Sequence, residues 1–281
     1  MFIRRDIRRQ FDRAAASFDT ADFVHAVTRE GLVARLEPLR VEARTILDLG
    51  AATGATGRQL RRRFRRARII SLDLSQAMLA EARKRKTLLA KASFVQADAA
   101  RLPFADDCFD LVVANQLLPW IPEPGLVFSE VARVLRKGGV FTFATLGPDS
   151  LRELAAAWAG VDEAAHVNRF EDMHNIGDAL VRAGLSDPVL DVDRLAVSYD
   201  NADRLFADLT LAGARNALSG RPRGLQGRKR FQAMKDALAP RNGAAQIVLD
   251  LELVYGHCWG AGAKKDQGQF HIDANSIPLR R

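Results

Sequence analysis

One short segment limits the possible folds of this chain more than any other. Residues 46–57 read Ile-Leu-Asp-Leu-Gly-Ala-Ala-Thr-Gly-Ala-Thr-Gly, an apolar run that leads into a turn of small residues. Asp73 ends a second apolar run, which begins at Ile69. A strand, a turn of small residues and a later carboxylate are typical of a nucleotide-binding, Rossmann-like sheet. The turn lets a ligand approach the backbone, and the carboxylate accepts hydrogen bonds from ribose hydroxyls.

Strand-like and helix-like segments alternate through the first half of the chain. Apolar, β-branched runs predict strands that are buried on both faces. These runs lie near residues 45–49, 68–73, 92–97, 109–114 and 139–146, and two more lie near 189–199 and 246–256. Amphipathic segments between them predict helices, among them 125–136, for which Lys137-Gly138-Gly139 has the pattern of a C-terminal cap. The alternation predicts an α/β fold with a doubly wound, mostly parallel, seven-stranded sheet.

Segments outside this alternation are expected to form a helical cap. Residues 1–40 have apolar positions at helical spacing and predict an N-terminal helical cap segment. The main domain is expected over 41–260, with cap insertions near 149–185 and 203–241. The tail over 261–281 is rich in glycine and lysine, and within it Gln269–Ala274 predict a short edge strand.

Composition argues against several classes of protein. The 281 residues contain no run of about eighteen apolar residues, so no transmembrane helix is expected. The N-terminus is rich in arginine, but Asp6 and Asp12 argue against a transit peptide, and we expect a cytoplasmic protein. Two distant cysteines, Cys108 and Cys258, and five histidines without ligand spacing argue against a disulfide framework or a metal site. The net charge of +8 indicates an acidic partner, and the lack of a recognition helix argues against nucleic acid.

Candidate ligand-binding residues follow four of the predicted strands. Because the carboxyl ends of parallel strands meet at one edge of a sheet, these residues are expected to share one site. They are Asp48, Gly50 and Gly54, then Asp73 and Leu74, then Asp98 and Ala99, and finally Asn115 and Gln116. Each alone has a plainer interpretation, since an aspartate after a strand often caps a helix and an asparagine often forms a turn. Their repetition at successive strand ends predicts a nucleotide-like cofactor site.

The spacing around the first turn, acid-x-Gly-x-x-x-Gly from Asp48 to Gly54, resembles the first motif of class I S-adenosylmethionine (SAM) methyltransferases. The resemblance implies SAM as cofactor, with ribose hydroxyls on Asp73 and the adenine amino group on Asp98. Gly50 and Gly54 would let the backbone pass the methionine part. Ala52 replaces the central glycine of the motif. Its methyl group is tolerable at negative φ but would crowd the cofactor at positive φ.

Segments outside the sheet resemble a narrower family, the malonyl-acyl carrier protein O-methyltransferases of biotin synthesis. The similar segments are 11–19, 102–105, 144–154, 166–170, 172–180, 213–217 and 220–228, within residues 8–258. The resemblance implies methylation of the free carboxyl of malonyl-acyl carrier protein to its methyl ester, an early step toward pimeloyl and biotin. Phe18 departs from the tyrosine that is common in the family at this position, in the segment thought to close over the active site.

The implied reaction fixes which acceptor-side groups to expect. The malonyl carboxyl is already ionised at neutral pH, so no strong general base is needed. A cation must instead hold the carboxylate, and Arg169 and Arg215 are the candidates, since an arginine fork binds a carboxylate in two places. His166 and Phe18 complete the predicted catalytic set. The plainer interpretations are a surface salt bridge for Arg169 and a structural hydrogen bond for His166.

An acidic carrier protein would also explain the basic surplus of the chain. The docking patch is predicted to comprise some of the residues Arg221, Arg223, Arg228, Lys229 and Arg230. Three other functions stay open at this point. These are an arginine hydroxylase of the kind that assists assembly of respiratory complex I, a methyltransferase for another carboxylate or small molecule, and a non-catalytic binding module. The sequence leaves undecided the oligomeric state and whether the carrier protein or a coenzyme A thioester is preferred.

Overall fold

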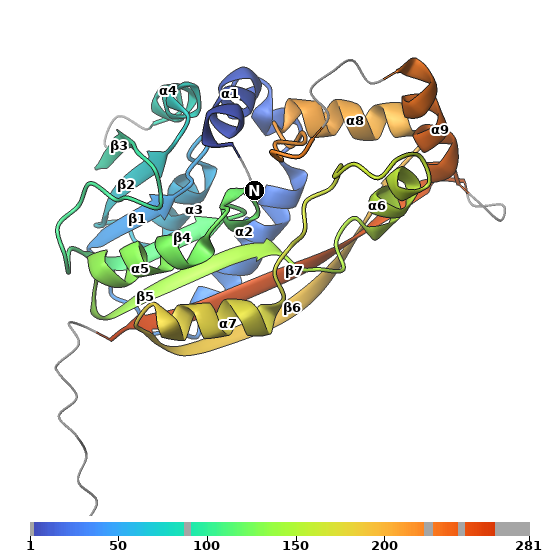
Figure 1. Cartoon of the computed structure of the whole chain (residues 1–281). Coiled ribbons are helices and arrows are strands. Elements are labelled where there is room, and N and C mark those ends of the chain that lie inside the picture. Colours follow the sequence, from blue (N-terminus) through green and yellow to red (C-terminus); the bar gives the residue numbers. More distant parts are fainter. Residues whose placement is uncertain (1–2, 87–90, 222–226, 241–244, 262–281) are drawn as a thin grey trace, which may run out of the picture.

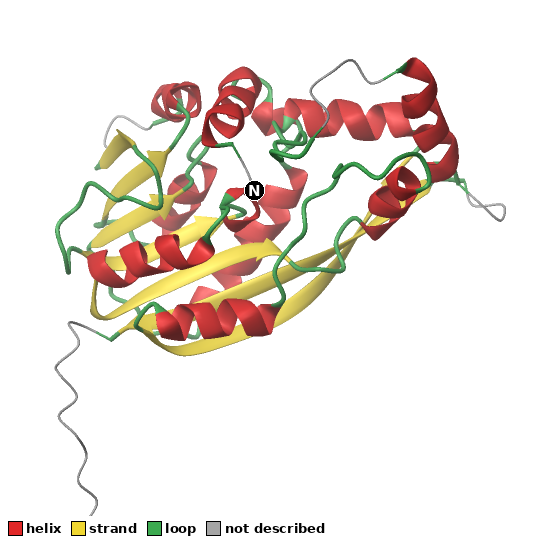
Figure 2. Cartoon of the chain, viewed as in Figure 1, coloured by secondary structure: helices red, strands yellow, loops and turns green. Residues whose placement is uncertain are grey.

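A computed structural model describes residues 3–86, 91–221, 227–240 and 245–261 of the chain, and its centre is a seven-stranded sheet (Figures 1 and 2). The strand order is β3-β2-β1-β4-β5-β7-β6. The strands from β3 to β5 run parallel, and β7 and β6 add an antiparallel edge. The order reverses between β1 and β4, which is where ligands bind in sheets of this kind.

The strands and helices follow the predicted alternation. The strands are β1 (Thr45–Leu49), β2 (Arg68–Asp73), β3 (Ala92–Gln96), β4 (Phe109–Asn115), β5 (Leu135–Leu146), β6 (Leu185–Tyr199) and β7 (Ile247–Gly260). The helices are α1 (Arg4–Ala14), α2 (Phe23–Leu36), α3 (Ala55–Arg63), α4 (Gln76–Lys84), α5 (Pro124–Val134), α6 (Arg152–Ala159), α7 (Met173–Arg182), α8 (Ala202–Leu211) and α9 (Arg228–Leu238). Two short 3-10 helices are η1 (Phe18–Thr20) and η2 (Leu118–Trp120).

Each face of the sheet has its own core. Successive side chains of a strand point to opposite faces, so Leu47 packs in one core and Ile46 in the other. The Leu47 core is covered by α5 and α7, which contribute Phe128 and Leu180. The Ile46 core is covered by α2 and α3, and α2 contributes Leu36. Figure 2 shows helices on both sides of the sheet, as a doubly wound fold requires.

A third cluster holds the helices that lie beyond the sheet. Trp158 of α6, Leu205 of α8 and Met234 of α9 pack together against Ile247 and its neighbours, where β6 and β7 extend past the other strands. Figure 1 shows α6, α8 and α9 at this end of the molecule, while α7 lies beside β6. Part of the predicted 149–185 insertion therefore covers the sheet.

One predicted helix end is wrong. Helix α5 ends at Val134, and the chain enters β5 at Leu135, so Lys137-Gly138-Gly139 lie in a strand and cap no helix. Gly138 does adopt φ +73°, the left-handed conformation that makes glycine common at helix ends. The glycine pair therefore does indicate a left-handed backbone conformation, but this conformation lies within a strand and not at the end of a helix. The predicted edge strand at Gln269–Ala274 lies outside the described residues.

Candidate active site

Several residues of the turn after β1 adopt the left-handed backbone conformation. Gly50 has φ +74° and Gly54 has φ +77°, and Gly54 precedes the first residue of α3. A Cβ atom on Gly50 would lie 3.0 Å from Leu117 Cδ1, so this position favours glycine for two reasons. The amides of Gly50 and Ala51 donate to the Leu72 carbonyl at 2.9 and 3.0 Å, which fixes the turn against β2.

Ala52 also has positive φ, at +45°, which is the less favourable of the two cases that the sequence left open. A left-handed conformation costs a non-glycine residue about 1–2 kcal/mol. The Ala52 amide donates to Asp73 Oδ2 at 2.8 Å, a bond that holds the residue in this conformation. The methyl group lines the pocket described below.

Two carboxyls lie at this turn with different surroundings, since Asp48 is buried and Asp73 is half-buried. Asp73 accepts hydrogen bonds from the amides of Ala52 and Ser75, both at 2.8 Å, and burial raises its pKa to about 6. Asp48 accepts from the Gly57 amide at 2.9 Å. Burial, and to a smaller extent the charge of Asp73, raise the pKa of Asp48 to about 7. Asp73 therefore ionises more readily than Asp48.

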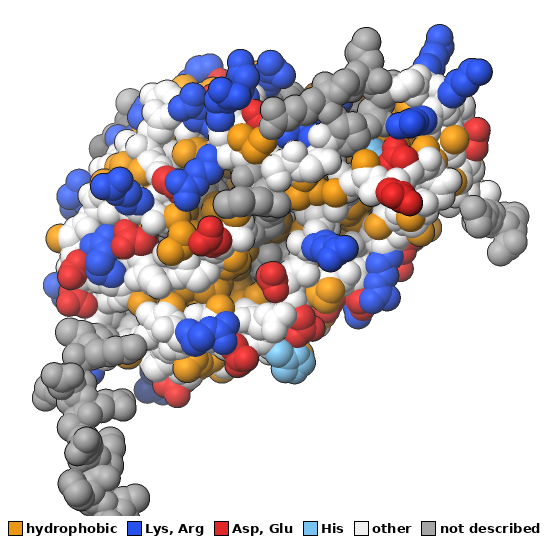
Figure 3. Space-filling model, in the orientation of Figure 1, with side chains coloured by type: hydrophobic (Ala, Val, Ile, Leu, Met, Phe, Trp, Pro, Cys, Tyr) orange, Lys and Arg blue, Asp and Glu red, His pale blue; other side chains and the backbone are white. Residues whose placement is uncertain are grey.

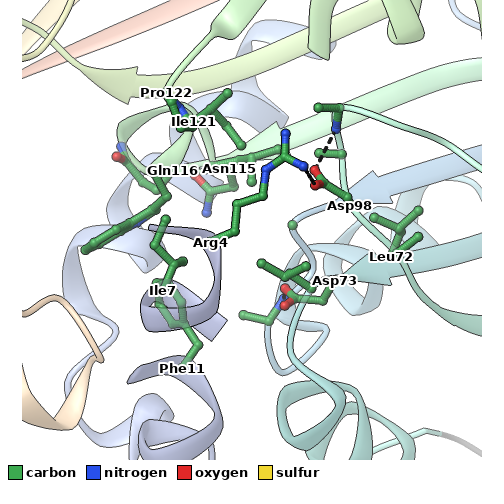
Figure 4. A pocket seen from close by; sticks show the side chains of 18 of the residues that line it. Arg4, Ile7, Phe11, Leu72, Asp73, Asp98, Asn115, Gln116, Ile121 and Pro122 are labelled. Carbon is green, nitrogen blue, oxygen red and sulfur yellow. Dashed lines mark hydrogen bonds and ion pairs between the residues drawn. The ribbon is translucent and has the colours of Figure 1, made fainter. Parts of the chain in front are cut away.

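A pocket of about 510 Å³ opens above the carboxyl ends of β1, β2 and β4 (Figure 4). This volume is typical of a small-molecule site. Seven of the nine predicted cofactor residues line it, namely Gly50, Asp73, Leu74, Asp98, Ala99, Asn115 and Gln116. Asp48 and Gly54 do not line it. Asp48 is engaged by the Gly57 amide at the start of α3, and Gly54 shapes the backbone of the turn.

Arg4 of α1 enters the same pocket, although no sequence motif predicts this position. Its guanidinium forms an ion pair with Asp98 Oδ2 at 2.8 Å, and Figure 4 shows it reaching across the pocket from α1 to Asp98. The other Asp98 oxygen accepts the Ala100 amide at 2.9 Å. Both oxygens of this carboxylate are therefore engaged by the protein.

The two residues after β4 have different tasks. The Thr28 hydroxyl donates to Asn115 Oδ1 at 2.7 Å, and Asn115 Nδ2 donates to the His25 carbonyl at 2.9 Å. Both ends of the Asn115 amide are thus used to hold α2 over the sheet. Gln116 is a buried non-glycine residue at φ +55°, and its Nε2 has no hydrogen-bond partner among the described residues. A strained residue with a free donor in a pocket is typical of a ligand contact.

Phe18 is buried and lines the pocket from η1. Its ring meets the His25 ring edge-on, with centroids 5.0 Å apart. Burial, and then the charge of Arg29, lower the pKa of His25 to about 4, so this imidazole is neutral near neutral pH. Phe18 therefore supplies an apolar wall to the pocket.

A second pocket, of about 390 Å³, adjoins the first and shares Ile121 and Pro122 with it. Arg169 lines the second pocket. His166 lines neither pocket, because its ring stacks on Trp158 at 3.6 Å and its Nε2 lies 2.7 Å from Asp162 Oδ1. Arg215 is exposed on the loop after α8 and also lines neither. The structure thus separates Arg169 from the two other predicted polar catalytic residues.

Neither a metal site nor a membrane span is found in the part of the chain that the structure describes. No group of three or more histidine, cysteine, aspartate or glutamate side chains there could hold a metal ion. No helix there is long and apolar enough to cross a bilayer. The side chains that line the two pockets supply carboxylates, amides, two arginines and apolar walls.

Comparisons with known proteins agree with this arrangement. The family described as "Methyltransferase domain" matches residues 47–143. Curated malonyl-[acyl-carrier protein] O-methyltransferases are similar along nearly their whole length. The enzyme of Halorhodospira halophila is 40% identical, and the match covers 99% of this chain and 96% of the relative. The enzyme of Laribacter hongkongensis is also 40% identical, and the match covers 92% of this chain and 90% of the relative. That of Xylella fastidiosa is 36% identical over 100% and 98%.

Solved structures share the fold at low sequence identity. The YcgJ protein of Bacillus subtilis has a TM-score of 0.59 at 16% identity, covering 84% of this chain and 97% of its own. A putative methyltransferase of Haloferax volcanii has a TM-score of 0.56 at 21% identity, covering 92% and 99%. These likenesses and the sheet topology confirm the predicted fold class.

Proposed function

The chain belongs to the malonyl-[acyl-carrier protein] O-methyltransferase family, and from this premise we propose that it methylates the free carboxylate of a carrier-bound malonyl group. The methyl donor in this proposal is SAM, and the product is the malonyl methyl ester of biotin synthesis. Of the functions that the sequence left open, family membership favours carboxyl methylation over arginine hydroxylation. The structural observation that carries the proposal is the pair of adjoining pockets, one lined by the cofactor-motif residues and the other by a free arginine.

The residues of the first pocket fit SAM. Asp73 is the acceptor for ribose hydroxyls, and its position is fixed by two backbone amides. Asp98 is the acceptor for the adenine amino group once Arg4 shares or releases it. The Gln116 amide is a buried donor for a carbonyl or carboxylate oxygen. SAM supplies a methyl group on a positively charged sulfur, and the protein has only to position the acceptor and exclude water.

Arg169 is our candidate for the group that holds the malonyl carboxylate. Among the described residues that line the two pockets, the arginines are Arg4 and Arg169. Arg4 is paired with Asp98, whereas no ion pair of Arg169 is found within the described ranges. A guanidinium can bind both carboxylate oxygens and orient the acceptor, since it carries parallel donors. His166 and Arg215 contribute less directly, because both lie outside the pockets.

The candidate residues for the docking patch differ in how far other residues of the protein neutralise their charges. Arg221 is half-buried and pairs with Asp6 at 2.7 Å, so its charge is already neutralised within the protein. Arg230 lies 3.8 Å from Asp162, and Arg223 is outside the described residues. Arg228 and Lys229 are exposed at the start of α9, and Figure 3 shows basic side chains at that end of the molecule. We therefore place the acidic carrier protein near α9, and reversing both charges should raise KM but leave SAM binding unchanged.

The decisive experiment is a transfer assay with labelled SAM and malonyl-acyl carrier protein, with unacylated carrier protein as control. We expect label in a methyl ester with the malonyl form alone. Arg169→Gln should reduce kcat/KM by about 10–100-fold, since a hydrogen-bonded charge contributes about 1.5–3 kcal/mol. Arg215→Gln is the matched control for an exposed arginine outside the pockets. SAM binding without transfer to the malonyl form would refute the proposed acceptor.

A further inference from the structure

We propose that the second pocket binds the prosthetic arm that links the malonyl thioester to its carrier protein. The arm is a slender chain that is attached to the carrier protein through a phosphodiester. Its inner part is uncharged, contains two amide groups and ends in the sulfur that bears the acyl group. This inference rests on the proposed function and adds to it the path by which the substrate reaches the methyl donor. Four features of the pocket carry it.

The first feature is that the two pockets adjoin each other. Ile121 and Pro122 line both, so a ligand that extends past these residues contacts both pockets. Figure 4 shows Ile121 and Pro122 at the edge of the first pocket, beyond Asn115 and Gln116. An acyl group at this junction lies beside the methyl-donor site, and the chain attached to it must extend into the second pocket.

The second feature is the chemistry of the lining. Most of the lining residues are apolar, and they include three prolines, Pro119, Pro122 and Pro124, which offer no backbone N–H. The remaining apolar members include Leu118, Leu146, Ala165, Val167 and Leu218. Figure 3 shows hydrophobic side chains gathered in the hollowed middle of this face. Such a surface binds a neutral chain with methyl groups better than a charged nucleotide.

The third feature is the small number of charges. Arg169 and Glu171 are the charged residues that line this pocket within the described ranges, and both are exposed. The amide of Asn175 lies 3.4 Å from a Glu171 carboxylate oxygen, whereas Arg169 has no ion pair in the described part of the chain. One free cation suits the single carboxylate of the malonyl group, because the inner part of the arm next to it is uncharged.

The fourth feature is that the pocket wall is held in place by Asn216. Its Nδ2 donates to the Ala165 carbonyl at 2.7 Å, and its Oδ1 accepts the Leu218 amide at 2.9 Å. The Asn216 carbonyl accepts a hydrogen bond from the Gln10 side chain of α1 at 3.2 Å. One residue thus joins both sides of the second pocket to the helix that lines the first, and the path is formed before the substrate arrives.

Blocking the second pocket tests the inference. Ala165 is exposed and lines this pocket, so Ala165→Trp fills it without disturbing a core. Ala155→Trp is the matched control, because Ala155 is exposed on α6 and lines neither pocket. The substrates are malonyl-acyl carrier protein and the short thioester malonyl-N-acetylcysteamine, which lacks most of the arm. SAM binding by calorimetry reports that each variant is folded.

We expect Ala165→Trp to raise KM for malonyl-acyl carrier protein by about tenfold or more, which corresponds to about 1.4 kcal/mol. Its SAM affinity should match that of the wild type, its kcat/KM for the short thioester should fall much less than that for malonyl-acyl carrier protein, and Ala155→Trp should change nothing. Leu218→Trp, on the opposite side of the pocket, should repeat the result if the first variant folds poorly. Equal losses with both substrates, or no loss with either, would overturn the inference. An absence of transfer by the wild type would instead refute the proposed function.

Discussion

Replacing Asp48 with asparagine is expected to stabilise the protein at alkaline pH. Asp48 is 1% exposed, and its Oδ2 accepts the Gly57 amide. Its pKa rises from an ordinary value of 3.8 to about 7, mainly because burial disfavours the charged form. Above pH 7 the folded protein must therefore keep a buried negative charge that water solvates freely in the unfolded chain.

The sign and size of the effect follow from the two pKa values. Between pH 3.8 and 7 the folded protein retains a proton that the unfolded chain has released, so the free energy of unfolding falls as the pH rises. The full shift corresponds to about 4 kcal/mol at neutral pH and above, at about 1.36 kcal/mol for each pKa unit. An asparagine cannot ionise, and its side-chain oxygen can still accept the Gly57 amide. The gain from Asp48→Asn should therefore be small near pH 4 and reach at most about 4 kcal/mol at pH 8.

Urea unfolding at pH 5 and pH 8 measures this difference directly. Asp110→Asn is the control of opposite sign. Burial opposes ionisation of Asp110, but hydrogen bonds from Thr45, Arg136 and Arg44 outweigh it and lower the pKa of this carboxyl. Its stabilising contribution is present above the ordinary pKa, so Asp110→Asn should destabilise the protein at pH 8. If Asp48→Asn unfolded at lower urea than the wild type at pH 8, the reasoning from burial would be refuted.

Three further predictions concern the first pocket. Because the pKa of Asp73 is about 6, SAM affinity should fall by up to about tenfold for each pH unit below 6, and calorimetry on Asp73→Asn should show weak binding without this pH dependence. Ala52→Gly relieves a left-handed conformation, so stability should rise by up to about 1 kcal/mol after the entropy gained by the unfolded chain is subtracted. Urea unfolding checks this, and a loss above about 1 kcal/mol would contradict it. Gln116→Leu removes a buried donor without a partner, so stability should hold or rise while kcat/KM falls; unchanged kcat/KM would exclude a ligand contact.

The sheet and most of the first pocket were predictable because they depend on local patterns. A parallel strand that is buried on both faces must read as an apolar run, and its carboxyl end must lie at the same edge as those of its neighbours. Asp73, Asp98 and Asn115 were found in this way. The same logic cannot tell which way a side chain points at the end of a strand. Asp48 therefore looked like a cofactor residue, although its carboxylate is bonded to Gly57 and does not line the pocket.

The remaining parts of the site join segments that are distant in sequence. Arg4 meets Asp98, and Thr28 meets Asn115 across 87 residues, with no local pattern at either end that announces the pairing. The second pocket likewise needs Ala165 and Leu218 to be brought together by Asn216. Such contacts follow only from the packed fold. The family resemblance marked the segments around Asn216 and Arg169 as specific, but it could not say that they form a wall.

The two N-terminal helices that line the first pocket are held by different contacts. Helix α2 places Leu32 and Leu36 in a core of the sheet, and each buried leucine contributes about 1.5–3 kcal/mol. Helix α1 buries Ile7 and Ala14, and its Phe11 packs against the small cluster beside Phe18. Arg4 reaches Asp98 through an ion pair whose arginine is 59% exposed. Exposed ion pairs of this kind contribute about 1 kcal/mol or less. Displacing the Arg4 side chain from Asp98 therefore costs little free energy, so a ligand that binds Asp98 can replace this ion pair.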